Sequence, residues 1–172
     1  MWHGGGRKGP PMSNVPPSKR EPSNIEYVCN AAKLFSYTLD CAIKLPKRWT
    51  FLLTERAVDA AARVLEHAKA ANSIYVSCAA DADLRRLHLD QAYCYSQVLA
   101  SYVDEMFARF PSREDGRGAC ISQAAYLRWV EAIDREFKLV RGVMASDRKR
   151  FARYYERDGP SSAASQLGLF DI

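Results

Sequence analysis

The sequence predicts an all-α fold, an antiparallel up-and-down bundle of four helices. Apolar residues recur at intervals of three and four in four separate stretches, which is the spacing of one face of an α-helix. No stretch of useful length alternates apolar and polar residues as a half-buried strand does. The connections are short, which favours antiparallel neighbours. We expect a disordered basic arm at residues 1–22, the bundle at residues 23–157 and a flexible tail at residues 158–172.

The first helix is expected between Ile25 and Leu45. Ser23 and Glu26 have the spacing of a capping box, in which two side chains satisfy backbone N–H groups at a helix start. Pro46 ends the helix, because proline disfavours helical geometry in the residue before it. The stripe expected to face the core consists of Ile25, Val28, Cys29, Ala32, Phe35, Leu39, Ala42 and Ile43.

The second helix is expected from Trp49 to Ala71, and its stripe is rich in alanine. Small side chains let helix axes approach closely, so this helix should be central to the packing. The stripe consists of Leu53, Ala57, Ala60, Ala61, Val64, Ala68 and Ala71. The segment Ile74–Ala80 fits a continuation of this helix and a connector equally well, because its periodicity does not distinguish the two.

Two longer helices follow. The third is expected from Asp81 or Asp83 to Phe110, with acids in its first turn, where the helix dipole favours them. Its stripe consists of Leu84, Leu87, Ala92, Tyr95, Val98, Leu99, Tyr102, Met106 and Phe110. The fourth is expected over residues 121–151, with a basic extension to residue 157. Its stripe consists of Tyr126, Trp129, Val130, Ile133, Phe137, Val140 and Met144.

The net charge of +5 is unevenly distributed along the chain. Residues 1–20 carry four bases and no acid, residues 21–140 carry 15 bases and 16 acids, and residues 141–172 carry six bases and four acids. The body is therefore close to neutral, and a basic surface requires that its bases gather on particular faces. Three consecutive glycines and five prolines in residues 1–22 predict the disordered arm.

The composition predicts a cytoplasmic protein without a membrane partner. No apolar run approaches the roughly 20 residues that cross a bilayer. The five cysteines are odd in number and form no C-x-x-C pair, which fits reduced thiols and argues against disulfides and a zinc site.

The sequence predicts no catalytic residue, metal site or cofactor. His67 and His88 lie on different helices, and His88 shares a helix side with Leu84 and Tyr95, which favours a packed histidine. A metal site in a bundle core is typically built from Glu-x-x-His pairs on facing helices, and the sequence has none. It also lacks the G-x-x-x-x-G-K-[ST] loop of nucleotide-binding proteins.

Basic residues are the stronger candidates for a binding site. They cluster at the corner between the first two helices, recur on the second helix and follow the outer side of the fourth. Arginine prevails on the fourth helix, which favours phosphate or carboxylate ligands. The alternative is a solvated helix surface with no specific partner. The candidate residues are Lys44, Lys47, Arg48, Arg56, Arg63, Arg128, Arg135, Lys138 and Arg141.

Several short motifs together resemble a known family. These are Leu34-Phe35, the Leu45-Pro46-Lys47-Arg48 corner, Phe51-Leu52-Leu53, and Tyr126-Leu127-Arg128-Trp129. They are similar to motifs of the accessory variability determinant proteins of diversity-generating retroelements. Those proteins are four-helix bundles related to the ribosomal intervening-sequence proteins. The resemblance covers residues 25–151.

The resemblance implies a basic, barrel-like homopentamer without catalytic activity, encoded by a bacterium, a phage or another mobile element. Such a protein binds a reverse transcriptase and its template RNA, or the hybrid of RNA and cDNA, and supports mutagenic cDNA synthesis. The residues that match the family's basic corner and faces are Lys47, Arg48, Arg56, Arg128 and Arg135. The arm, the basic extension and the near-neutral body depart from the family pattern.

A second resemblance is confined to the tail. Gln166, Leu167, Leu169 and Phe170 match the Q-L-[SD]-L-F peptide that docks bacterial proteins on the DNA polymerase sliding clamp, whereas Gly168 departs from it. A docking peptide suits a chain end. It supports an alternative function, a helical adaptor between proteins whose tail binds the clamp.

Overall fold

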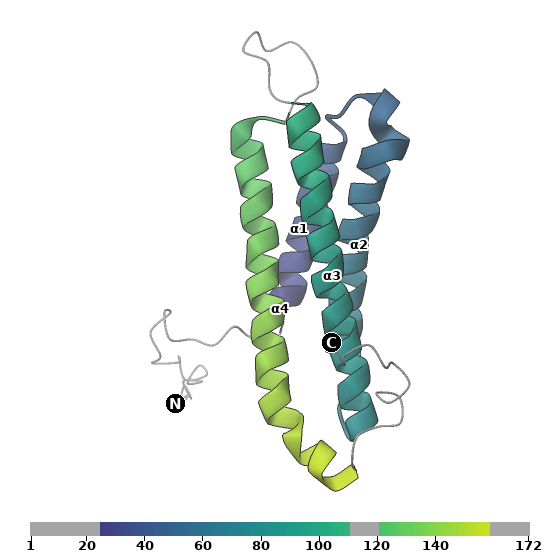
Figure 1. The fold of residues 1–172 in the computed structure, drawn as a ribbon, viewed down its shortest axis with the longest axis vertical. Helices are drawn as coiled ribbons and strands as arrows, with labels where there is room; N and C mark the ends of the chain where they lie inside the picture. Colours follow the sequence, from purple (N-terminus) through teal and green to yellow (C-terminus); the bar gives the residue numbers. More distant parts are fainter. Residues whose placement is uncertain (1–24, 111–120, 159–172) are drawn as a thin grey trace, which may run out of the picture.

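The amphipathic stretches form four long α-helices that lie side by side (Figure 1). The structure, a computed structural model, describes residues 25–110 and 121–158. The helices are α1 (Glu26–Ala42), α2 (Glu55–Ser73), α3 (Ala79–Arg109) and α4 (Gln123–Asp158). The predicted all-α fold is confirmed for these residues, which contain no strand. The predicted arm, the clamp-like peptide and all but the first residue of the predicted tail lie outside the described residues.

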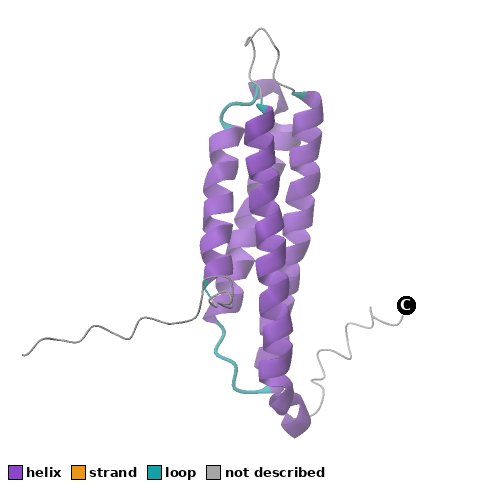
Figure 2. Cartoon of the chain, turned by 90° about the vertical axis from the view of Figure 1, so that its left-hand side faces the viewer, coloured by secondary structure: helices purple, strands orange, loops and turns teal. Residues whose placement is uncertain are grey.

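The helices are arranged in a ring in which each packs against two neighbours. α1 contacts α2 and α4, and α3 also contacts α2 and α4. Consecutive helices run in opposite directions (Figures 1 and 2). Because α1 and α3 lie on one diagonal of the bundle and α2 and α4 on the other, the outer sides of each diagonal pair point away from each other.

Alanine on the inner side of α2 lets this helix approach its neighbours closely. Five alanines and Val64 of the predicted stripe are all at least 98% buried, and Leu53 is half-buried. The predicted small-residue core side of α2 is therefore confirmed, but α2 is not central, because it packs against two neighbours as every helix of the ring does. The buried members of the stripe are Ala57, Ala60, Ala61, Val64, Ala68 and Ala71.

Trp129 anchors the upper part of the core. Its indole is fully buried, and its N–H donates a hydrogen bond to Thr38 Oγ1 on α1 at 3.0 Å. The Thr38 hydroxyl in turn donates to the carbonyl of Leu34 at 2.8 Å. Tyr37 meets the Trp129 ring edge-on, with ring centroids 6.2 Å apart. These contacts join α1 to α4 with the indole N–H satisfied.

The connection between α1 and α2 differs from the prediction. α1 ends at Ala42 rather than Leu45, because Pro46 has extended backbone (φ −63°, ψ 134°) and the chain must leave the helix before it. The second helix does not begin as an α-helix at Trp49. A 3₁₀ turn, η2 (Lys47–Trp49), and a π-helical turn, η3 (Thr50–Thr54), come first.

Other helix boundaries also differ from the predicted ones. Residues 74–78 form a connector, and α3 begins before both predicted starts, because the backbone N–H and hydroxyl of Ser77 bind the Asp81 carboxylate at 3.0 and 2.7 Å. At the start of α1, Ile25 occupies the cap position and makes no side-chain capping bond. The expected capping residue, Ser23, lies outside the described residues.

The predicted core stripe of α1 is wrong for half of its residues, which lie on the outer side of the helix, whereas Val28 and Phe35 pack against the core. Ile25 and Ile43 are 56% and 80% exposed, and Cys29 and Leu39 are exposed as well. The buried side is instead formed by Tyr27, Asn30, Ala31, Leu34, Thr38 and Cys41. Residues on both sides of α1 recur with a helical period. The buried side includes polar residues that are hydrogen-bonded, and a pattern of apolar residues alone predicts such residues to be exposed.

The α3 and α4 stripes are partly right. On α3, Leu84, Leu87 and Val98 are exposed, while Leu99 and Met106 are buried as predicted. On α4 the predicted residues are buried or half-buried. Its inner side additionally buries Glu136, Leu139, Val143, Asp147 and Phe151.

Candidate nucleic-acid interface

The inner side of α4 determines which of its residues face the solvent. Trp129, Ile133, Val140 and Phe151 are buried on that side. Since each residue turns the side chain by about 100°, the basic residues between them fall on the outer side. This sequence pattern places cations along one exposed surface of a single helix.

The exposed cations from residue 138 to residue 153 together form what we call the α4 basic face. All are exposed, and none has a carboxylate partner among the described residues. At about 1.5 Å per residue the face is roughly 22 Å long. It consists of Lys138, Arg141, Arg148, Lys149, Arg150 and Arg153.

Burial of one acid makes this face uniformly basic. Asp147 is the single acid in residues 138–153, and it points into the bundle. Arg85 of α3 donates to its carboxylate at 2.6 Å and also to the carbonyl of Ala71 at the end of α2. The charge of Asp147 is therefore neutralised inside, and the cations on either side of it meet no acid at the surface.

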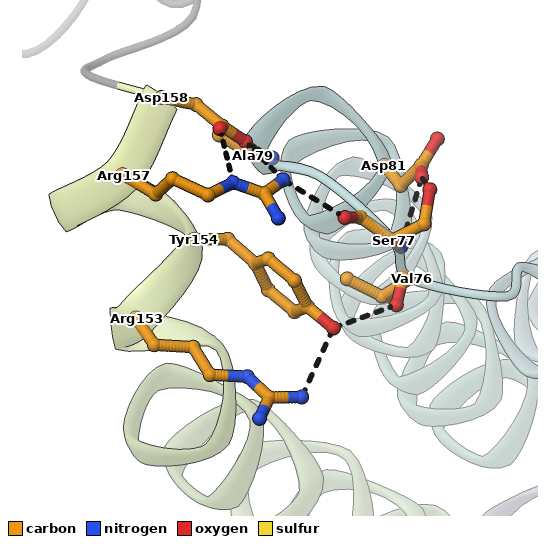
Figure 3. A network of polar contacts seen from close by, with 8 residues as sticks. All are labelled: Val76, Ser77, Ala79, Asp81, Arg153, Tyr154, Arg157 and Asp158. Carbon is orange, nitrogen blue, oxygen red and sulfur yellow. Dashed lines mark hydrogen bonds and ion pairs between the residues drawn. The ribbon is translucent and has the colours of Figure 1, made fainter.

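Hydrogen bonds hold the last turns of α4 against the connector between α2 and α3 (Figure 3). Tyr154 donates to the carbonyl of Val76 at 3.2 Å, and Arg157 donates to that of Ser77 at 3.1 Å. The N–H of Ala79 donates to Asp158 at 3.0 Å. Bonds from Arg157 and then from Ala79 hold the pKa of the Asp158 carboxyl below its usual range. The basic extension is therefore fixed in place.

A second contact fixes the same region to α3. Tyr155 donates a hydrogen bond to Asp83 at 2.6 Å, and burial together with this bond raises the pKa of Tyr155 to about 12. The tyrosine therefore stays a neutral donor at every pH at which the fold is of interest. Beside it, Arg86 and Arg148 line a cavity of about 80 Å³ between α3 and α4. Arg86 pairs with Asp90 of α3 at 3.7 Å, so it adds little free charge next to the α4 basic face.

The nine predicted candidates are all exposed but do not form one surface. Lys44, Lys47 and Arg48 lie at the α1–α2 end of the bundle, whereas Arg56 and Arg63 lie on α2, diagonally opposite α4. The remaining four, Arg128, Arg135, Lys138 and Arg141, are on α4.

Two of the predicted cations are partly neutralised. Arg63 donates to Asp59 at 3.1 Å, and Arg135 donates to Glu26 of α1 at 2.8 Å. Each pair is exposed, so each side chain remains accessible, but a nearby carboxylate weakens its attraction for a phosphate. The structure thus favours Lys138 and Arg141 over these two.

The prediction left four members of the α4 basic face out of the candidate site: Arg148, Lys149, Arg150 and Arg153. The signal was present in the run Asp147-Arg148-Lys149-Arg150. In the sequence, Asp147 counts as a surface acid that offsets part of this basic run. Its pairing with Arg85, 62 residues away, is visible only in the folded chain.

His67 and His88 are brought together across α2 and α3. Their Nδ1 atoms are 3.0 Å apart, which fits a hydrogen bond with one ring as donor, and Tyr95 stacks on His67. Burial and then His88 lower the pKa of His67, so the neutral pair is favoured. The prediction of a packed His88 is confirmed. Within residues 25–110 and 121–158, no three potential ligands from His, Cys, Asp and Glu gather to hold a metal ion.

Comparison of the chain with protein-family models, curated proteins and solved structures finds no match.

Proposed function

We propose that the protein is a nucleic-acid-binding accessory protein without catalytic activity, and that the α4 basic face is its RNA-binding surface. The observation that carries this proposal is the row of six exposed cations without a facing acid, held on a helix whose end is fixed by hydrogen bonds. A rigid cationic row attracts the phosphates of a polynucleotide backbone, and the release of counterions drives the binding.

The composition of the face favours phosphate contacts over base reading. Arginine contributes four of the six cations, and its planar fork binds phosphate oxygens through two hydrogen bonds at once. Contacts of this kind position a backbone but carry no direct information about base sequence. Binding should therefore tolerate many RNA sequences.

The resemblance to accessory variability determinant proteins gives this binding a biological role. In that role the protein binds a reverse transcriptase and its template RNA and supports mutagenic cDNA synthesis. A cationic surface without a catalytic group suits a factor that holds the template while the polymerase supplies the chemistry. The α4 basic face supports the RNA part of this role, and the motifs near Leu45 and Tyr126 support the family part.

The role further includes assembly of identical copies. The outer side of α1 forms an apolar ridge, which we call the α1 ridge, flanked by the exposed Lys33 and Asp40, and α3 carries a similar apolar ridge, the α3 ridge. Exposed apolar strips of this length mark contact sites on soluble proteins. The exposed apolar members of the α1 ridge are Ile25, Cys29, Leu39 and Ile43, and those of the α3 ridge are Leu84, Leu87, Cys94 and Val98.

Because α1 and α3 are diagonal to each other, their ridges point in opposite directions. One copy can therefore place its α1 ridge on the α3 ridge of the next. Repeating this contact between unlike surfaces produces a closed ring when the rotation per copy fits. A homopentameric barrel, as the resemblance implies, is one such ring.

Fluorescence anisotropy with labelled RNAs of unrelated sequence tests the RNA-binding proposal. Changing Lys138, Arg148 and Lys149 to glutamine should weaken binding to all the RNAs alike. It should also reduce the slope of log affinity against log salt by about 2, if each residue contacts one phosphate of a single strand. The fold should persist, because surface changes usually cost under about 0.5 kcal/mol.

The matched control removes the same charge from cations that have carboxylate partners, in the triple variant Arg63→Gln, Arg86→Gln, Arg109→Gln. It should keep most of the affinity and the slope. Equal losses in both triple variants would show an effect of net charge only. Unchanged affinity in the folded α4 variant would favour the adaptor function.

A further inference from the structure

The α1–α2 end of the bundle exposes large apolar side chains in the same place as cations. Ile43, Phe51 and Leu52 are 80%, 78% and 60% exposed, far more than core residues of their type. Residues 43–54 lie at the upper end of the bundle in Figure 1, where α1 passes into α2 and where α3 ends and α4 begins. We call this segment the α1–α2 tip. Exposure of this kind indicates a contact surface.

All the charges on the tip are positive. Residues 43–54 contain Lys44, Lys47 and Arg48 and no acid. All three are exposed, and none has a carboxylate partner among the described residues. The guanidinium of Arg48 lies 5.9 Å from the centre of the Trp49 ring. Apolar and cationic side chains are therefore presented together.

The backbone of the tip is irregular, with the 3₁₀ turn η2 followed by the π turn η3. Leu53 and Thr54 face inward on the same side as Ala57, whereas Phe51 and Leu52 are exposed. Trp49 packs edge-on against Phe110 with ring centroids 5.6 Å apart. π-helical turns are uncommon and occur frequently at functional sites.

We infer that the α1–α2 tip docks on the surface of an anionic lipid bilayer. At such a surface, Phe51 and Leu52 enter the boundary between headgroups and acyl chains while Lys44, Lys47 and Arg48 contact anionic headgroups. An RNA strand would pair with the cations but would leave Phe51 and Leu52 facing water or phosphate. The tip of a second copy of the chain would place its three cations against the same three cations here, which would repel it.

Surface docking requires no membrane-spanning segment. Within the described ranges, no helix combines the length and the apolar character needed to cross a bilayer. The tip is separate from the α4 basic face, so lipid and RNA binding can be tested independently. The inference does not depend on the proposed RNA-binding function.

Co-sedimentation of the full chain with vesicles tests the inference. Vesicles of phosphatidylcholine with phosphatidylglycerol should bind the protein, and vesicles of phosphatidylcholine alone should bind it much more weakly. Phe51→Ser with Leu52→Ser should reduce binding at least about tenfold. Changing the three cations to glutamine should reduce it on the order of a hundredfold at low salt.

The matched control is Tyr75→Ser with Leu127→Ser, which removes two exposed apolar side chains outside the tip and outside both ridges. It should bind vesicles like the wild type. Circular dichroism confirms that each variant is folded. The inference is overturned if the wild type does not bind anionic vesicles, or if both serine variants bind equally well. If Phe51→Ser with Leu52→Ser weakens RNA binding and the wild type does not bind vesicles, the tip is part of an RNA-binding site instead.

Discussion

At the scale of single residues, Glu136 is the most unusual group in the core. It is fully buried between α4 and α1, and Asn30 Nδ2 donates a hydrogen bond to its Oε2 at 2.7 Å. Its other oxygen has no hydrogen-bond partner within the described residues. Burial raises the pKa of Glu136 to about 7, and the Asn30 bond offsets only part of this effect. At neutral pH the core thus holds a carboxyl that is close to ionising.

This raised pKa makes the free energy of unfolding depend on pH. The unfolded chain loses the Glu136 proton near its ordinary pKa of 4.5, whereas the folded chain keeps it to about 7. Stability should therefore be greatest below the unfolded pKa and fall as pH rises through 7. The difference between a pKa of 4.5 and one of about 7 corresponds to about 3 kcal/mol. The free energy of unfolding of Glu136→Gln should exceed that of the wild type by most of this amount at pH 8 and by little at pH 4.5.

Urea unfolding at a series of pH values measures this effect. The matched control is Glu131→Gln, which changes an exposed glutamate on the same helix and should reproduce the wild-type profile. If Glu136→Gln loses stability between pH 5 and pH 8 as steeply as the wild type, the pH dependence has another origin.

At the scale of helices, the buried pair of Arg85 and Asp147 connects three elements. Arg85 of α3 binds the Asp147 carboxylate of α4 at 2.6 Å and the Ala71 carbonyl at the end of α2. A buried pair adds little stability compared with an apolar replacement, but the loss of one partner leaves an uncompensated charge. The pair therefore fixes how the lower parts of these helices meet.

Asp147→Ala should destabilise the protein by about 3–5 kcal/mol, because it leaves the Arg85 guanidinium buried without its carboxylate. Urea unfolding measures this loss. Asp134→Ala, the matched change at an exposed acid of α4, should cost under about 0.5 kcal/mol. Similar losses in the two variants would contradict the role of the pair.

Helix type and order could be predicted from the sequence because α2 and α4 each have one clearly apolar side. α1 could not be oriented in the same way, since its outer side is as apolar as its inner side. Its inner side contains Asn30 and Thr38, whose polar atoms are satisfied by Glu136 and Leu34. Those bonds form only in the folded chain. The apolar pattern of α1 therefore predicted its ridge, rather than its true inner side, as the side that faces the core.

Only part of the α4 basic face was predicted, and the reason is similar. Lys138 and Arg141 follow from the helical period, but the rest of the α4 basic face depends on where Asp147 points. The tip was predicted as a regular start of the second helix, because Trp49-Thr50-Phe51-Leu52-Leu53 contains no helix-breaking residue. Packing of Trp49 on Phe110 accompanies the irregular turns there, and sequence periodicity carries no signal for it.

At the scale of the whole molecule, the two ridges predict how copies meet. Cys29 lies on the α1 ridge between Tyr27 and Ala31, and Cys94 lies on the α3 ridge between Tyr93 and Tyr95. These four neighbours pack in the same core cluster, and α1 and α3 run in the same direction. The two cysteines are therefore at nearly the same height. In a ring with parallel helices, Cys29 of one copy should face Cys94 of the next.

Mild oxidation of the wild-type chain should form disulfides between Cys29 and Cys94 of different copies, which mass spectrometry of the linked peptides identifies. A disulfide forms when the Cα atoms come within about 7 Å. Cys29→Ser and Cys94→Ser should each prevent this link, and light scattering should still show an oligomer for both. Linkage of Cys29 to Cys29 would indicate a two-fold dimer instead. A monomer at micromolar concentration would contradict assembly altogether.

The most direct test of the central claim is a map of where RNA touches the protein. Thiouridine-substituted RNA can be photo-crosslinked to the full chain and the linked peptides identified by mass spectrometry. The α4 basic face predicts that the cross-links concentrate in residues 138–153. Cross-links confined to α2 or to the α1–α2 tip, or no cross-links at low salt, would contradict it.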